Sequence, residues 1–246
     1  MVIAISETRA RQQSALLREE GKIPPRRIEY IGTRPSSGGA GQPQAFTIEM
    51  TPNEEFGPHY HTVDQYQLIL HGDGRIGRRP LSTYSVHYTD RYTSYGPLVA
   101  GERSMHYMTL RAKADPGPQY LSRPGVREAQ QPSLRRFRLQ ADIGVLDSDR
   151  VNALAEPLVT PLIGPDDDGM QSLAIRLAPG MTAPLPDPAS GAGQYLFVMA
   201  GELRLGDEVL DRHATIFVPA DEPAPVLRAG AAGAQLLLMQ FPRQAA

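Results

Sequence analysis

The chain has 246 residues, enough for one large domain or two of about 120. Its net charge of −2 gives no general attraction to nucleic acid or membranes, and the absence of Cys excludes disulfides, thiolate ligands and a cysteine nucleophile. Frequent turn formers, 23 Gly and 23 Pro between short apolar runs, favour an all-β fold. We expect a cytoplasmic protein without nucleic-acid or membrane partners, because no apolar run has signal-peptide or membrane-spanning length.

Residues 6–20 are predicted to form a helix. Ser6 can cap its start, Glu7 is favourable in the first turn, and Gly21 can end it. The apolar face of this segment is modest, so we interpret residues 1–43 as an N-terminal arm that packs against the protein or against another subunit.

A histidine pair follows in the stretch from residue 57 to residue 72. His59 and His61 are two residues apart, and residues i and i+2 of a strand point to the same face. Two imidazoles on one face suit zinc, iron, copper or nickel. The same alternation turns Gln65 and Gln67 inward if the strand is unbroken, and buried amides need partners.

The chain contains an internal repeat. Residues 44–52 align with residues 171–179 at an offset of 127 (171 − 44), and both alternate apolar and polar residues as half-buried strands do. Gln65 aligns with Gln194 at an offset of 129 (194 − 65), which places a two-residue insertion between the two matches. One β unit therefore occurs twice. The Gly72–Gly74 stretch is predicted to be a hairpin turn.

The repeat divides the chain into a first domain over residues 44–112, a connector over 113–155 and a second domain over 156–246. The second copy has Pro188 and Ser190 where the first has its two histidines. We therefore expect the second domain to be structural and the chemistry to belong to the first.

These patterns resemble the cupin superfamily in its two-domain, or bicupin, arrangement. Its first motif is Gly, His-x-His, Glu and Gly, and the corresponding residues here are Gly57, His59, His61, Gln65 and Gly72. The departures are a shortened gap after the first Gly and Gln in place of Glu. The resemblance covers residues 44–111 and 171–240.

The second cupin motif is clearer in the second copy. Residues 214–224 are similar to its strand and turn, with Ala224 at the position of the motif's His. Subtracting 129 places Tyr95 there in the first copy.

The resemblance implies an all-β fold of two cupin-type antiparallel β-barrels (double-stranded β-helix, or jelly roll) behind an N-terminal helical arm. It implies a metal set of His59, His61 and Gln65, with Gln65 as an oxygen ligand or a hydrogen-bonding neighbour. Tyr95 or His106 could complete the set or act in catalysis, although Tyr95 could equally be an aromatic lid. The predicted pocket residues are Gln67, His87 and Tyr107, and a hydrogen-bonded core histidine is the alternative for His87.

By resemblance, the function is that of a metal-dependent enzyme acting on a small organic molecule, as a dioxygenase, isomerase or lyase. The cofactor would be a divalent Fe, Mn, Ni or Zn ion, and many cupins are homodimers. The alternative is a non-catalytic bicupin that binds a small molecule without metal. Gln at position 65 and the incomplete second motif favour this alternative, whereas the inward histidines and clustered tyrosines favour the enzyme.

Overall fold

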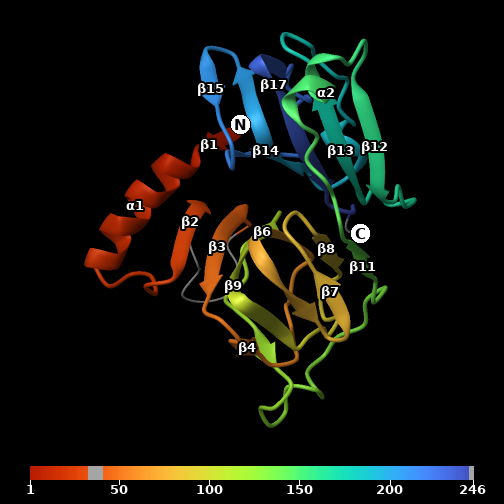
Figure 1. The fold of residues 1–246 in the computed structure, drawn as a ribbon. Coiled ribbons are helices and arrows are strands. Elements are labelled where there is room, and N and C mark those ends of the chain that lie inside the picture. The colour runs from red at the N-terminus through yellow and green to blue at the C-terminus, as the bar shows by residue number, and fades with distance from the viewer. Residues whose placement is uncertain (33–40, 244–246) are drawn as a thin grey trace. The chain divides into compact units, whose positions relative to one another are not determined.

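The computed structural model describes residues 1–32 and 41–243 and divides the chain into two compact units (Figure 1). The N-terminal unit comprises residues 13–143, and the C-terminal unit comprises residues 1–12 together with 144–246. The fold is mostly β with antiparallel pairing, as expected. In the described part of the chain, no helix has the length and apolar character needed to cross a membrane.

The N-terminal unit is built on one eight-stranded sheet of order β11-β8-β6-β9-β3-β2, in which β4 also pairs with β9 and β7 with β6. A separate two-stranded sheet joins β10 to β5. The strands are β2 (Arg27–Ile31), β3 (Gln44–Met50), β4 (Glu55–Phe56), β5 (His59–Tyr60), β6 (Gln65–Ile76), β7 (Arg79–Leu81), β8 (Val86–Thr89), β9 (Leu98–Arg111), β10 (Gln119–Tyr120) and β11 (Phe137–Gln140).

The C-terminal unit is built on a seven-stranded sheet of order β1-β16-β14-β17-β13-β12, with β15 paired to β14. The elements are β1 (Ile3–Ile5), α2 (Ser148–Asn152), β12 (Leu158–Ile163), β13 (Gln171–Leu177), the 3₁₀ helix η1 (Pro188–Ser190), β14 (Gln194–Leu205), β15 (Glu208–Leu210), β16 (Thr215–Val218) and β17 (Arg228–Gln240). The first residues of the chain thus add a strand to the sheet formed by its last third, which the sequence did not predict.

The predicted first helix is confirmed to within one residue at each end. Helix α1 spans Glu7–Glu19, and the Oγ of Ser6 accepts a hydrogen bond from the backbone N–H of Arg9 at 3.2 Å. Gly21 follows with a φ of +69°, the left-handed conformation typical of a residue that ends a helix.

The strand register confirms the internal repeat. Gln65 begins β6 and Gln194 begins β14, the two strands that pair with equivalent partners in the two units. Tyr66 pairs with Leu110, and the residues 129 positions later, Tyr195 and Met239, pair in the same way. The two copies therefore share strand order and register.

The prediction of a hairpin turn at Gly72–Gly74 is wrong. Strand β6 continues through these residues to Ile76, and its register against β9 shifts there. Gly72 has a φ of +77°, and a Cβ on it would overlap the carbonyl oxygen of Ser104. These glycines therefore form a β-bulge, where the sequence signature of a turn also occurs.

Strand alternation defines the inner face of the N-terminal unit. Its apolar part is a buried cluster that includes Met50, Ile69, Met105 and Tyr107. Residues two positions away along the same strands point to the same side. This parity directs Gln65 and Gln67 of β6 inward together with Ile69.

Candidate metal and ligand site of the N-terminal unit

A pocket of about 170 Å³ opens on this inner face. Its walls carry aromatic rings, three charged side chains and the two motif histidines, all from the N-terminal unit. The aromatic residues are Phe46, Phe56, Tyr95, Tyr107 and Tyr120, the charged residues are Arg27, Arg111 and Asp115, and the histidines are His59 and His61.

His59 lies on the short strand β5 and is 5% exposed. Its backbone exchanges two hydrogen bonds with Tyr95, so the two residues form a β-bridge. Its Nδ1 atom lies 2.7 Å from the carbonyl oxygen of Gly57, and its Nε2 atom lies 2.9 Å from the Tyr95 hydroxyl. Since a carbonyl can only accept, the Nδ1 of His59 donates and its Nε2 carries the lone pair.

His61 lies beside His59, with ring centroids 5.3 Å apart. Its Nδ1 atom is 2.8 Å from Oδ1 of Asp115 and 3.0 Å from Nη2 of Arg111. Burial, with the nearby charge of Arg111, lowers the pKa of His61 to about 3, and burial also lowers the pKa of His59. Both imidazoles are therefore neutral at neutral pH, the form in which histidine binds a metal.

Gln65 links Tyr95 to Arg111. Its Nε2 donates to the Tyr95 hydroxyl at 2.6 Å, and its Oε1 accepts from Nε and Nη2 of Arg111 at 3.2 and 2.9 Å. Burial raises the pKa of Tyr95 above its ordinary value, so the phenol keeps its proton and donates it to the Nε2 of His59. The amide oxygen of Gln65 is thus bound to Arg111 and lies behind the two histidines.

Asp115 and Arg111 are central residues that sequence reasoning missed. Asp115 is 1% exposed, follows β9 in what was interpreted as a connector, and accepts hydrogen bonds from His61, Thr62 and Gly117. Burial alone raises the pKa of its carboxyl, but the bond from His61 and the charge of Arg111 outweigh this and hold it well below its usual range. The available signal was the spacing of Arg111, which shares the inward parity of Tyr107 on β9.

Two of the three predicted pocket residues, Gln67 and Tyr107, line the pocket. His87 lies inside the unit and is 2% exposed, but both of its ring nitrogens are hydrogen-bonded, to Oε1 of Gln67 at 3.1 Å and to Oγ1 of Thr89 at 2.6 Å. This is the geometry of the alternative weighed for His87, a hydrogen-bonded core histidine.

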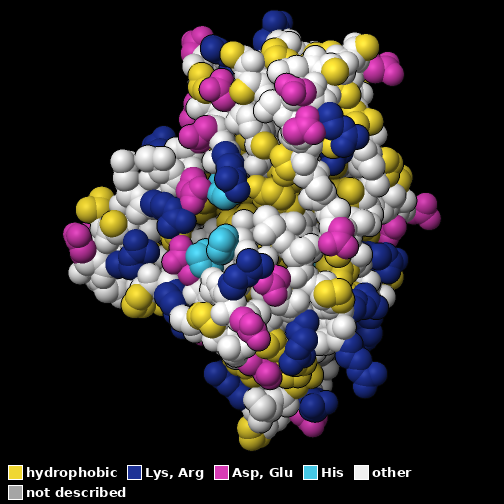
Figure 2. Space-filling model, in the orientation of Figure 1, with side chains coloured by type: hydrophobic (Ala, Val, Ile, Leu, Met, Phe, Trp, Pro, Cys, Tyr) yellow, Lys and Arg dark blue, Asp and Glu magenta, His cyan; other side chains and the backbone are white. Residues whose placement is uncertain are grey.

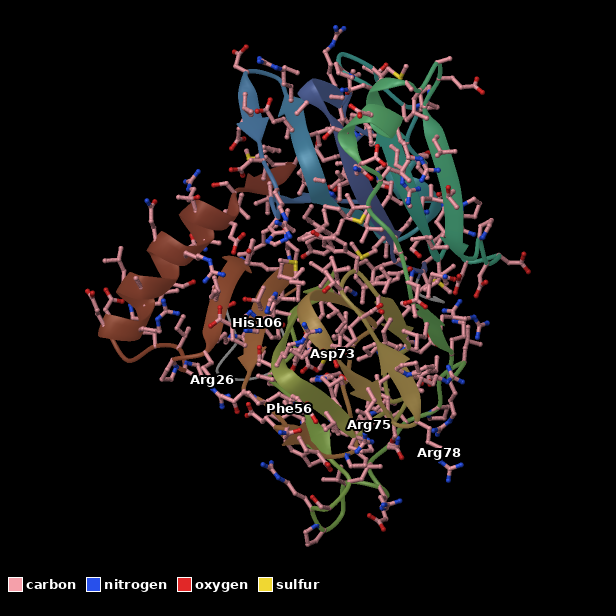
Figure 3. All side chains as sticks on the ribbon, in the orientation of Figure 1. Arg26, Phe56, Asp73, Arg75, Arg78 and His106 are labelled. Carbon is pink, nitrogen blue, oxygen red and sulfur yellow. The ribbon has the colours of Figure 1, made fainter. Side chains whose placement is uncertain are left out.

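The structure does not bring His106 into the pocket, and its predicted ligand or catalytic role is corrected. Tyr107 points inward on β9, so its neighbour His106 points to the opposite face of the sheet. His106 opposes His71 of β6, with ring centroids 5.2 Å apart. In Figure 3 it lies apart from Phe56, a wall residue of the pocket. Figure 2 shows histidine side chains at the molecular surface, and His71 is exposed.

The donors for a metal ion are few. Among the described residues, no group of three or more His, Asp or Glu side chains is placed to hold a metal. The pocket instead offers two neutral imidazoles and the Tyr95 hydroxyl beside His59. These residues fit a divalent ion as a set of two nitrogens and one phenol oxygen, with coordination positions left for water or a ligand.

No protein-family model matches this chain, and no curated protein matches it. Solved structures do. Salicylate 1,2-dioxygenase from Pseudaminobacter salicylatoxidans is similar with a TM-score of 0.58 at 12% identity, over 97% of this chain and 83% of that one. A structure of the same enzyme with gentisate has a TM-score of 0.55 at 13% identity, over 97% and 80% of the two chains. A Nostoc punctiforme protein described provisionally as a dioxygenase has a TM-score of 0.58 at 13% identity, over 89% and 75%.

At these identities the likeness concerns the fold. It covers nearly the whole chain and shows that the chain shares the mostly antiparallel β fold of these structures.

Proposed function

We propose that this chain is a cupin-type enzyme that acts on a small organic molecule with the help of one divalent metal ion in its N-terminal unit. The observation that carries the proposal is the pair of buried, neutral imidazoles of His59 and His61 on the wall of an aromatic pocket. Unlike the hydrogen-bonded His87, these two histidines line the pocket together with the Tyr95 hydroxyl, where a ligand can reach them.

His59, His61 and Tyr95 would hold the metal, and Gln65 would act from behind them. When bound, a divalent ion would act as a Lewis acid toward an oxygen of the substrate. The protein itself contributes the Tyr95 hydroxyl, a proton donor 2.9 Å from Nε2 of His59, and the rings of Tyr107 and Phe46, which line the pocket. Iron, manganese, nickel and zinc all accept nitrogen and oxygen ligands of this kind.

The size of the pocket supports a ligand with a single ring. Its volume of about 170 Å³ is similar to the apolar cavity of about 150 Å³ that accommodates benzene in another protein. The solved structures similar in fold include salicylate 1,2-dioxygenase with gentisate bound. Aromatic acids are therefore the first compounds to test.

We further propose that each unit closes as a cupin barrel, with the C-terminal copy structural, and that the chain forms a homodimer. The repeated strand register and the loss of both histidines from the second copy support the division of roles. Light scattering on the purified chain would measure the oligomeric state.

A second candidate, binding of a small molecule without metal, is favoured by one observation. The guanidinium of Arg111 holds the oxygen of Gln65 and approaches Nδ1 of His61 at 3.0 Å. A fixed positive charge beside the ligand set opposes the binding of a cation. It equally favours an anionic group on a bound molecule.

The two candidates differ in their response to metal removal. For the enzyme, metal-reconstituted protein should consume gentisate, salicylate or a related aromatic acid, with oxygen uptake and product formation measured together. Turnover should stop on chelation. If calorimetry instead detects an aromatic ligand whose affinity does not change on chelation, and no compound is converted, the metal-free binding protein is the better account.

A further inference from the structure

The Nδ1 atom of His61 has two neighbours with opposite requirements. Oδ1 of Asp115, at 2.8 Å, can only accept a proton from the ring, whereas Nη2 of Arg111, at 3.0 Å, can only donate one to it. A neutral imidazole carries a single N–H, so Nδ1 can satisfy one of these neighbours but not both. The outcome decides whether the lone pair of His61 lies on Nε2 or on Nδ1.

The contacts around Asp115 favour the carboxylate in this competition. Oδ2 accepts from the N–H of Thr62 at 3.0 Å and from its hydroxyl at 2.8 Å, and Oδ1 also accepts from the N–H of Gly117 at 2.7 Å. With donors on both oxygens, the carboxylate has no room for a proton of its own and needs the ring N–H of His61. Arg111 has another acceptor for its Nη2, the oxygen of Gln65 at 2.9 Å.

We propose that Asp115 is a positioning residue, which keeps the proton of His61 on Nδ1 and thereby leaves the Nε2 lone pair free for a ligand, in competition with Arg111. The inference deepens the proposed function, because Nε2 is the atom that would bind the metal. The tautomer itself belongs to the metal-free chain and can be measured whether or not a metal binds.

Replacing the carboxylate by an amide should reverse the tautomer. In Asp115→Asn the single side-chain oxygen would stay with the two donors of Thr62, at the loss of the bond from the Gly117 N–H, and the new NH₂ group would turn toward His61. The amide and the guanidinium of Arg111 would then both donate to Nδ1, and the ring proton would move to Nε2. That proton would block the atom proposed as the metal ligand.

The experiment uses the full chain, stripped of metal and labelled with ¹⁵N-histidine. Long-range ¹H–¹⁵N spectra, with His61 assigned from a His61→Gln variant, report which ring nitrogen carries the proton. We expect Nδ1–H in the wild type and Nε2–H in Asp115→Asn. Calorimetric titration with Zn²⁺ should then give a dissociation constant about 10–100-fold higher for the variant, the usual effect of removing a residue that orients a ligand.

Asp90→Asn is the matched control. Asp90 is another buried carboxylate of the N-terminal unit, 4% exposed, and it accepts from Arg136 and from the Tyr88 hydroxyl. Its replacement should lower the melting temperature but leave the His61 tautomer and the Zn²⁺ affinity unchanged. If Asp115→Asn does not fold, Thr62→Val and Asp115→Glu provide the test, since both keep a carboxylate and should keep Nδ1–H.

The outcomes separate this inference from the proposed function. A folded Asp115→Asn that retains Nδ1–H, or a wild type that already has Nε2–H, would overturn the role of Asp115. Loss of Nδ1–H in Asp115→Glu would also overturn it. If the tautomer reverses as expected but the wild type binds no metal, the positioning role stands and the metal-dependent function fails.

Discussion

Substitution of Gln65 is the most informative single test of metal binding, because this residue stands where the cupin motif has Glu. Gln65→Glu would place a carboxylate, 1% exposed, against Arg111, whose Nε and Nη2 already contact Oε1 at 3.2 and 2.9 Å. The change would also remove the amide N–H that now donates to Tyr95. The Tyr95 hydroxyl could then donate to the carboxylate, which would release the Nε2 of His59 for a metal.

The size of the effect follows from two opposed contributions. At an effective dielectric constant of about 20, two unit charges about 4 Å apart interact by about 4 kcal/mol, so a new carboxylate attracts a divalent ion strongly. Arg111 shares that carboxylate, and burial of the charge costs several kcal/mol. We expect a net gain of about 1.4–2.8 kcal/mol in binding free energy, a 10–100-fold lower dissociation constant.

The assay is calorimetric titration of metal-stripped protein with Zn²⁺ and Mn²⁺. Gln67→Glu is the matched control, since it adds the same charge on the same strand face, but Gln67 bonds to His87 rather than to Arg111. Its affinity should change much less. An unchanged or weaker affinity in folded Gln65→Glu would refute the placement of the metal at His59, His61 and Tyr95, next to Gln65.

Two further predictions concern stability. His213 hydrogen-bonds Glu7 and, against the effect of burial, lowers the pKa of that carboxyl to about 2. Ionised Glu7 should therefore stabilise the protein above its unfolded pKa of about 4.5, and this stabilisation should be lost as the pH falls toward 2. Urea unfolding should show that Glu7→Gln lowers the free energy of unfolding by about 1–3 kcal/mol at pH 6 and by less at pH 3. The amide of Gln194 is 0% exposed and has no hydrogen-bond partner among the described residues. Gln194→Met should therefore raise the free energy of unfolding by about 1–3 kcal/mol, whereas Gln65→Met should lower it. A lower free energy of unfolding in Gln194→Met would contradict this reasoning.

The fold was largely predictable, because the repeat and the strand alternation are local properties of the sequence. The same alternation predicts Gln67 on the inner face, and the structure places Gln67 along the pocket together with Tyr107, which was predicted from the cluster of tyrosines. The prediction for His106 was wrong because alternation along β9 turns His106 to the face opposite Tyr107. The prediction at Gly72 was wrong because a bulge and a hairpin share glycine as their signature.

The other half of the site depends on contacts between distant segments. Asp115 reaches His61 across 54 positions of sequence, and Arg111 reaches Gln44 across 67. Neither residue belongs to a motif, and Asp115 lies among prolines that indicated only a connector. Strand β1 is a similar case, because its pairing with β16 joins opposite ends of the chain.

The most direct test of the central claim is the metal content of the protein, purified without a histidine tag, beside that of His59→Ala/His61→Ala. Mass spectrometry should find one divalent ion per wild-type chain and none in the double variant. The double variant should keep the fold, because the core cluster around Met50 and Met105 is apolar, with a lower melting temperature from the lost bond between His61 and Asp115. Undiminished metal in the double variant would place the site elsewhere. A wild type that takes up no metal after reconstitution with iron, manganese, nickel and zinc in turn would contradict the metal-dependent account.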